Sequence, residues 1–162
     1  MSTYKRENTC CFTGHRSIPL EHQELICKLI EKILLEYINN GYSNFCTGGA
    51  LGFDTLAAQA IINLACTHPH IRLILVLPCQ SQARYWSEQD YRVYENIKKQ
   101  AHEIIYTSNE YTRGCMFKRN RHLVDMSSLC VCYLTKNKGG TLYTVNYAAK
   151  NRLKVINIAK DI

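Results

Sequence analysis

The chain has 162 residues, of which 46% are hydrophobic and 20% are charged, a composition typical of globular proteins and far from that of disordered chains. This length fits one ordinary domain, so we predict a single domain over residues 1–162. No apolar run reaches the roughly 18–20 residues of a membrane span, and the polar segment Met1–Asn8 gives no signal-peptide pattern. We therefore expect a cytoplasmic protein without membrane partners.

The formal net charge of +7 suits an anionic partner. The basic residues are spread along the chain without a dense basic tail, so a solvated surface and a small anionic ligand are both compatible with them. No basic stripe interleaved with aromatic side chains is visible, so nucleic acid is not expected as a partner.

The nine cysteines form no C-x-x-C pair, and zinc sites usually need paired ligands at short spacing. Five of them lie in apolar, strand-like runs: Cys10, Cys11, Cys46, Cys130 and Cys132. Free cysteine commonly behaves as a small buried hydrophobic residue. We therefore predict buried structural thiols in a reducing compartment, rather than a metal or redox site.

Short strand-like runs alternate with longer helical patterns, as in βαβ units. Strands are expected at residues 9–13, 44–47, 71–77, 102–106, 129–134 and 154–158, and helices at residues 17–41, 54–67, 87–100, 116–125 and 138–151. Ser17 is the expected N-cap of the first helix, and Gly41 is its expected end. The pattern predicts an α/β fold: a Rossmann-like three-layer domain with a mostly parallel sheet and helices on both faces.

Three glycine-containing loops follow predicted strands. They are Gly14-His15-Arg16, the segment Gly48-Gly49-Ala50-Leu51-Gly52-Phe53-Asp54, and Gly139-Gly140-Thr141. The carboxyl ends of parallel strands share one edge of a sheet, where helix N-termini and flexible glycine backbone suit phosphate groups. We therefore predict a phosphate site formed by all three loops. The second loop matches neither G-x-G-x-x-G nor Walker A, which argues against dehydrogenases and NTPases.

Two arginines are the candidate anion clamps of this site, because a guanidinium binds phosphate in a bidentate way. For Arg16 and Arg119, solvation at the surface is equally compatible with the sequence. His15 is a candidate phosphate donor or a residue with a local structural role. Asn120 is a candidate reader of a ribose or base edge, or an ordinary polar helix residue.

Two further residues of the candidate site have competing interpretations. We favour an N-cap role for Asp54 over a catalytic acid, because a carboxylate beside phosphates repels them unless it faces a ribose hydroxyl or a cation. For Trp86 we favour core packing over stacking on a base. No serine–histidine–carboxylate set and no pair of carboxylates lies near the glycine loops.

Together these motifs resemble one known superfamily over roughly residues 9–158. The segments on which this resemblance rests are Cys11-Phe12-Thr13-Gly14-His15-Arg16, Thr47 to Asp54, Leu77-Pro78 with Trp86 downstream, and Arg119-Asn120. They resemble the YpsA/YoqJ-like branch of the SLOG superfamily, which also contains the LOG phosphoribohydrolases and DNA-processing protein A. The resemblance implies a Rossmann-like fold that binds nucleotides or derivatives of the ADP-ribose type.

The LOG enzymes are similar to this chain in Arg119-Asn120 but differ in the third loop. Their P-G-G-x-G-T-x-x-E motif carries a glutamate that serves in N-glycosidic cleavage. The resemblance places Thr141 on the threonine of that motif and Thr144 on the glutamate. A threonine cannot replace a carboxylate as a base or stabilise an oxocarbenium ion as well.

We therefore favour a non-catalytic binding protein, which senses or sequesters a nucleotide-derived molecule such as an ADP-ribose- or NAD-related signal. It would need no cofactor, and pairing into a homo-oligomer is compatible with it. The first alternative is a nucleotide N-glycosidic hydrolase that uses Asp54 or another acid. The second is single-stranded DNA binding, by analogy with DNA-processing protein A.

Overall fold

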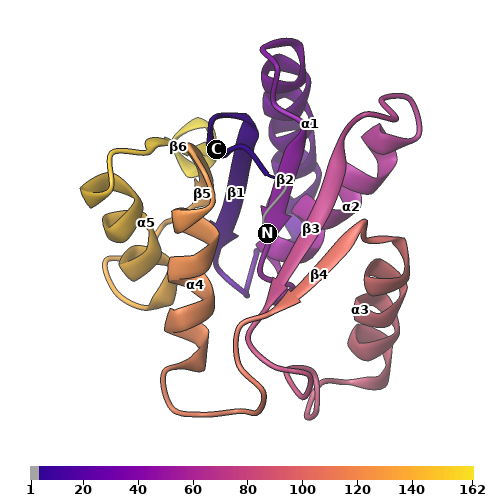
Figure 1. The fold of residues 1–162 in the computed structure, drawn as a ribbon, viewed down its shortest axis with the longest axis vertical. Helices are drawn as coiled ribbons and strands as arrows, with labels where there is room; N and C mark the ends of the chain where they lie inside the picture. Colours follow the sequence, from indigo (N-terminus) through magenta and orange to yellow (C-terminus); the bar gives the residue numbers. More distant parts are fainter. Residues whose placement is uncertain (1–3) are drawn as a thin grey trace.

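The computed structural model describes residues 4–162, and its six strands form one sheet in the order β4-β3-β2-β1-β5-β6 (Figure 1). The strands are β1 (Thr9–Gly14), β2 (Asn44–Thr47), β3 (Arg72–Leu77), β4 (Glu103–Tyr106), β5 (Leu129–Tyr133) and β6 (Lys154–Asn157). All neighbouring strands are parallel. The predicted α/β fold with a mostly parallel sheet is confirmed.

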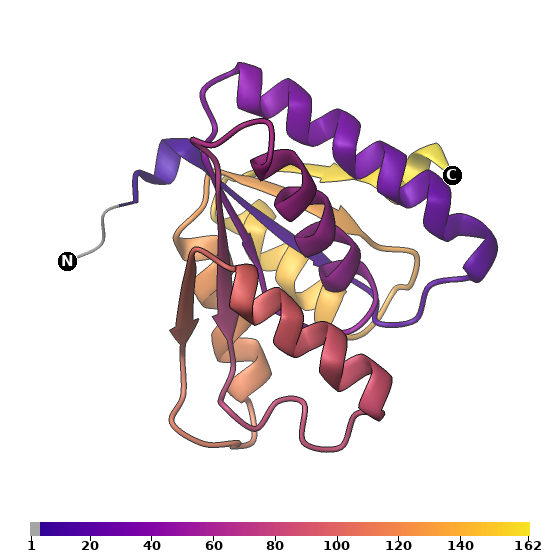
Figure 2. The ribbon, with the colours of Figure 1, turned by 90° about the vertical axis from the view of Figure 1, so that its right-hand side faces the viewer.

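Helices cover both faces of the sheet, which confirms the predicted three layers (Figures 1 and 2). The α-helices are α1 (Gln23–Asn39), α2 (Phe53–Ala65), α3 (Glu88–Gln100), α4 (Cys115–Asp125) and α5 (Gly140–Lys150), and the 3₁₀ turns are η1 (Arg6–Asn8), η2 (Leu20–His22) and η3 (Ile158–Asp161). α2 contacts both α1 and α3, while α4 contacts α5 on the other side. No helix among residues 4–162 is long and apolar enough to cross a membrane.

The direction of strand addition reverses at β1. From β1 the chain adds β2, β3 and β4 toward one edge of the sheet, and then returns through α4 to place β5 on the opposite side of β1. In open α/β sheets, ligands bind beyond the carboxyl ends of the strands at such a switch point. The loops that follow β1 and β5 therefore flank the switch point of this sheet.

The predicted burial of the strand cysteines is confirmed. Cys10, Cys11, Cys46, Cys130 and Cys132 are free thiols with at most 1% of their surface exposed. Burial raises the pKa of the Cys46 thiol well above its usual value, because the thiolate is penalised in a medium of low polarity. These thiols act as small core side chains between the sheet and its helices.

The predicted N-cap of the first helix is wrong. α1 begins at Gln23, after the 3₁₀ turn that follows Pro19, and Ser17 does not cap it. A helix capped by Ser17 would need Ile18 in helical conformation, and the residue before a proline disfavours that conformation. Gly41 does end the helix as predicted, with a φ of +94° just beyond it.

Candidate functional site

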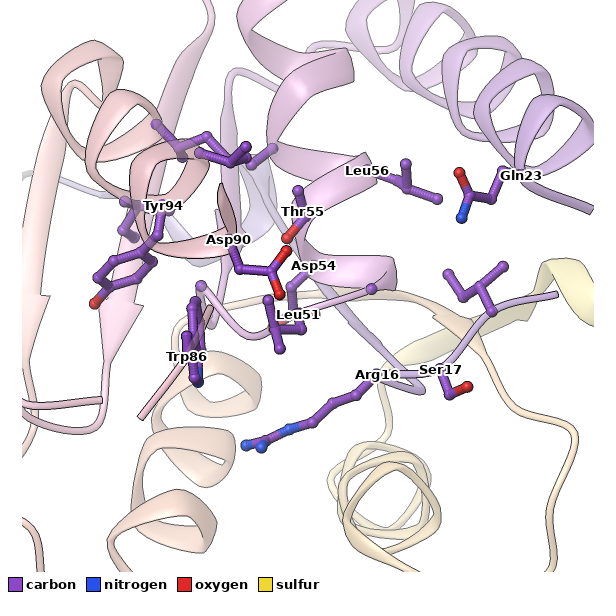
Figure 3. A pocket seen from close by; sticks show the side chains of 17 residues that line it. Arg16, Ser17, Gln23, Leu51, Asp54, Thr55, Leu56, Trp86, Asp90 and Tyr94 are labelled. Atoms are coloured by element: carbon purple, nitrogen blue, oxygen red, sulfur yellow. The ribbon is translucent and has the colours of Figure 1, made fainter. Parts of the chain in front are cut away.

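Two adjoining cavities open at the carboxyl ends of the strands. The loop cavity, of about 300 Å³, is lined by Thr13, Gly14, His15, Arg16, Ala50, Asp54, Met116, Arg119, Asn120, Gly140 and Thr141. The helix cavity, of about 410 Å³, lies between the starts of α2 and α3 and includes Gly49, Leu51, Gly52, Thr55, Trp86, Asp90 and Tyr94 (Figure 3). Arg16 and Asp54 line both cavities, so the two cavities adjoin at these residues and are treated together as the candidate site.

The loop cavity lies at the switch point of the sheet. Gly14 and Arg16 reach it from the end of β1, and Gly140 and Thr141 reach it from the start of α5, which follows β5. The first N–H groups of a helix have no partner within the helix, and they carry a partial positive charge. This end of α5 therefore presents donors that suit an anion.

Close backbone packing explains two of the glycines. A Cβ at Gly52, where φ is +76°, would lie 2.3 Å from the carbonyl oxygen of Arg16. The N–H of Phe53 donates to the carbonyl of His15 at 3.1 Å, which joins the first loop to the start of α2. A Cβ at Gly14 would meet the Phe53 ring at 2.5 Å. The absence of a side chain at Gly14 and Gly52 therefore allows the first two loops to pack closely against each other.

His15 has a structural role in this arrangement. Its Nε2 accepts a hydrogen bond from the backbone N–H of Thr135 at 2.9 Å, which links the loops after β1 and β5 across the switch point. Burial, together with the nearby charge of Lys136, lowers the pKa of the imidazole. The neutral ring with an unprotonated Nε2 is the form that this bond requires. Of the two interpretations of His15, the structure shows the local structural contact.

Arg119 is a buried residue, not a solvated one, with 4% of its surface exposed. Its Nη1 donates to the carbonyl of Gly48 and to Oε1 of Gln82 at 3.3 Å, and its Nε donates to Oδ1 of Asn120 at 2.7 Å. A Cβ at Gly48 would lie 2.7 Å from Nη1, so this glycine makes room for the guanidinium. Arg119 thus braces the second loop from α4 while also lining the loop cavity.

The predicted N-cap role of Asp54 is wrong, because Gly52 occupies the N-cap position and Asp54 lies inside the first turn of α2. Its Oδ2 instead accepts a hydrogen bond from the N–H of Ala50 at 3.1 Å, which fixes the curve of the second loop. Burial raises the pKa of Asp54 to about 6, although Arg119, the Ala50 N–H and Arg16 oppose this shift. The carboxyl group therefore exchanges its proton close to neutral pH.

The raised pKa predicts how Asp54 changes stability with pH. Between pH 4 and 6 the unfolded chain has released this proton while the folded protein retains it, so the free energy of unfolding falls as pH rises through this window. The shift from 3.8 to about 6 corresponds to about 3 kcal/mol. We expect Asp54→Asn to lose this dependence.

Chemical denaturation of both proteins from pH 4 to 8 measures the effect. The stability of the wild type minus that of Asp54→Asn should fall across the window and level off above pH 7. Taking the difference removes groups common to both proteins, such as His15. If the free energies of unfolding of the two proteins ran parallel from pH 4 to 8, the pKa of Asp54 would be the same in the folded and unfolded states.

The helix cavity is lined by aromatic and polar side chains. Trp86 is half-buried and packs edge-on against Tyr94, with 5.0 Å between ring centroids. Figure 3 shows the Arg16 side chain extending from the loop after β1 toward the side of the cavity where Trp86 and Asp90 lie. The expected packing of Trp86 is present, and the same ring also lines the cavity.

The structure thus brings most of the candidate residues together, in two groups. Gly14, His15, Arg119, Asn120, Gly140 and Thr141 line the loop cavity, Gly49, Gly52 and Trp86 line the helix cavity, and Arg16 and Asp54 line both. Gly48 and Gly139 line neither: Gly48 accommodates Arg119, and Gly139 adopts a φ of +97° as the N-cap of α5.

Sequence reasoning missed Gln82 and Asp90. The buried Gln82 accepts from Arg119, and its Nε2 donates to the carbonyl of Gly49 at 3.4 Å, so it connects α4 to the second loop. Its position just after the β3 strand and Pro78 was the available signal, because residues at that edge of a parallel sheet face the site. Asp90 resembles an ordinary residue of the first turn of α3, which concealed its place in the helix cavity.

The third loop carries no carboxylate. Thr144, at the position where the resemblance to LOG enzymes places a glutamate, is 1% exposed, and its hydroxyl donates to the carbonyl of Gly140 at 2.8 Å. Asp54 is the one acidic residue among the described residues that line the loop cavity. Nowhere in residues 4–162 are three or more His, Cys, Asp or Glu side chains grouped so as to hold a metal ion.

The fold is similar to that of DNA processing protein A. The Helicobacter pylori protein, whose structure describes its single-stranded DNA binding mode, matches with a TM-score of 0.64 at 18% identity, over 91% of this chain and 63% of that one. The Streptococcus pneumoniae protein matches with a TM-score of 0.65 at 16% identity, over 92% of this chain and 49% of that one. This chain therefore spans about half to two thirds of those proteins, and the likeness concerns the fold.

Sequence relatives are closer. The SPbeta prophage-derived protein YoqJ of Bacillus subtilis is 31% identical over 83% of this chain and 84% of its own length. The UPF0398 protein BH1768 of Halalkalibacterium halodurans is 30% identical over 94% of this chain and 80% of its own length. The model of the YpsA family, described as the YspA SLOG family, matches residues 10–159. The resemblance found in the sequence is thereby confirmed, and this chain belongs to the YpsA SLOG family.

Proposed function

We propose that this protein binds a nucleotide-derived small molecule without cleaving it, with the phosphates in the loop cavity and the base in the helix cavity. A molecule of the ADP-ribose type has the chemistry that this arrangement suits. One observation carries the proposal: the two cavities join at Arg16, a cation with a long, exposed side chain. A single ligand that spans both cavities would place its charge beside that guanidinium.

Each cavity supports a different part of such a ligand. The start of α5 and the loop after β1 offer backbone donors to phosphate oxygens. Trp86 offers an aromatic face to a base, and Asp90 offers a carboxylate that accepts hydrogen bonds from an amino group. The side chain of Thr144 cannot supply the charge that cleavage of an N-glycosidic bond requires.

Arg16→Gln tests the central contact. Charge-assisted hydrogen bonds contribute about 1.5–3 kcal/mol, so we expect the affinity for ADP-ribose to fall about 10- to 100-fold. Calorimetric titration of wild type and variant measures this change. Arg84→Gln is the matched control, because Arg84 is also exposed but lines neither cavity. The proposal fails if wild type does not bind any nucleotide of a panel of mono-, di- and dinucleotides, or if Arg84→Gln weakens binding as much as Arg16→Gln does.

Hydrolysis is the alternative that one observation favours. A carboxyl group with a pKa of about 6, as found for Asp54, exchanges protons near the pH at which a general acid or base works best. Chromatography of nucleoside monophosphates and NAD after incubation with the protein detects released base. Base release by wild type that disappears in Asp54→Asn would establish the hydrolase and replace the binding proposal.

The similarity to DNA processing protein A weakens the expectation that nucleic acid is not a partner. The H. pylori protein binds single-stranded DNA, and its fold covers 91% of this chain. The cavities described above are sized for a small molecule, so a nucleic-acid strand requires another surface.

A further inference from the structure

An exposed face formed by α4, α5 and the end of β4 combines unpaired cations with aromatic rings. We name it the basic–aromatic face and define it by Tyr106, Arg113, Phe117, Lys118, Arg121 and Tyr143. These residues line two adjacent depressions of about 540 and 350 Å³, which share Lys118 and Arg121. We infer that this face binds single-stranded nucleic acid, through its phosphates and its bases. The inference does not rest on the proposed small-molecule site, since none of these residues lines either cavity of that site.

The aromatic rings are exposed, and two of them are held in place by their neighbours. Phe117, Tyr143 and Tyr106 are 43%, 36% and 37% exposed, although large apolar side chains are usually covered. Phe117 packs edge-on against Tyr143 with 4.6 Å between ring centroids, and the Tyr143 hydroxyl accepts a hydrogen bond from Arg121 at 3.0 Å. Fixed, exposed rings of this kind are platforms on which unpaired bases stack, whatever the base.

The cations of this face lack acidic partners. Arg113, Lys118 and Arg121 form no ion pair with any carboxylate of residues 4–162. One carboxylate, Asp125, lines the smaller depression, and its Oδ1 accepts a hydrogen bond from the Tyr147 hydroxyl. The face therefore has an excess of positive charge, which a chain of phosphates would neutralise.

The same charge argues against a second copy of this chain as the occupant. Closed dimers pair a surface with itself about a two-fold axis. Such pairing would bring the three cations of one copy against the three of the other, and juxtaposed like charges oppose association. A polyanion with flat, stacking groups matches both the charge and the rings of the face.

Fluorescence anisotropy with the full chain and labelled oligothymidylate and oligouridylate of about 15 nucleotides tests the inference. A duplex of the same length serves as the competitor that has phosphates but no free bases. We expect the single strands to bind at least several-fold more tightly than the duplex. Phe117→Ala/Tyr143→Ala should weaken single-strand binding about tenfold or more, with an unchanged salt dependence.

A charge variant separates the two contributions. Lys118→Gln/Arg121→Gln should weaken binding and lower the slope of log affinity against log salt by about 1.4, since each phosphate contact on a single strand contributes about 0.7. Lys32→Gln/Lys99→Gln removes the same charge from α1 and α3, across the sheet, and should change the affinity less than about twofold. Because the substituted side chains lie at the surface, melting temperatures should confirm that all the variants fold.

Five results would overturn the inference. The wild type could bind no single strand, or it could bind the duplex equally well. The control variant could lose as much affinity as Lys118→Gln/Arg121→Gln, which would indicate a general charge effect. Arg16→Gln could abolish strand binding while both variants of the face retain it, which would place the strand in the cavities. Finally, the wild type could be a dimer that Phe117→Ala/Tyr143→Ala dissociates without changing strand binding, which would assign the face to a second copy.

Discussion

Arg119→Met is expected to lower the free energy of unfolding by about 3–5 kcal/mol, since removing one partner of a buried charged network leaves the others uncompensated. The carbonyl of Gly48 and the amide oxygen of Gln82 would each lose a donor inside the protein. The buried Asp54 carboxyl would also lose the cation that does most to stabilise its ionised form. Methionine retains much of the side-chain volume, so the loss reports the charge and the hydrogen bonds.

The pH dependence of this loss identifies its origin. In Arg119→Met the pKa of Asp54 should rise further, so the destabilisation should be larger at pH 8 than at pH 5. Combining Arg119→Met with Asp54→Asn should cost less than the sum of the two single changes, because the two groups interact. Urea denaturation at both pH values gives these quantities. Lys118→Met, at the preceding exposed position of α4, should stay within about 0.5 kcal/mol; an equal loss there would remove the special role of Arg119.

Gly52→Ala is expected to cost about 3 kcal/mol or more. The backbone at Gly52 has φ +76° and ψ −119°, a conformation that residues other than glycine rarely adopt. The added Cβ would also lie 2.3 Å from the carbonyl oxygen of Arg16 and 2.6 Å from that of His15. Backbone atoms cannot move aside as a flexible side chain can, so the first loop must shift and carry Arg16 with it.

Gly41→Ala is the matched control for this change. Gly41 has a similar φ of +94°, but a Cβ there would meet nothing within 4 Å. Its cost should therefore be that of the backbone conformation alone, about 1–2 kcal/mol. The difference between the two variants in thermal or urea unfolding measures the steric term. Gly52→Ala should in addition weaken ADP-ribose binding, while Gly41→Ala should not. Equal losses of stability in Gly52→Ala and Gly41→Ala would show that the loop after β1 moves aside at little cost, and that the steric term is negligible.

The sequence predicted the fold because its information is local and repetitive. Alternation of short apolar runs with helical patterns identified all six strands within a few residues, and the apolar setting of the strand cysteines predicted their burial. Glycines at the end of β1, after β2 and before α5 placed the candidate site at the edge of the sheet where the two cavities open, because parallel strands leave their carboxyl ends together.

Individual roles were harder to predict, because they depend on contacts between distant segments. Asp54 and Ser17 both resembled N-caps. In the structure Gly52 is the N-cap of α2, and α1 begins only at Gln23, because Pro19 disfavours helical conformation at the residue before it. Arg119 could be a surface cation by its neighbours in the sequence. Only the packing of α4 against the second loop buries its guanidinium, which donates a hydrogen bond to the carbonyl of Gly48, 71 residues away in the sequence.

The sequence by itself thus determined the layered α/β fold, the family and the edge of the sheet that carries the candidate site. Only the tertiary structure decided that this edge holds two cavities joined at Arg16, and that the pKa of Asp54 lies near 6. The basic–aromatic face is the clearest case, since no stripe of this kind is visible along the chain. Its residues come from β4, α4 with the loop before it, and α5, which are separate in sequence, and the crossing of the chain at the switch point brings them together on one surface.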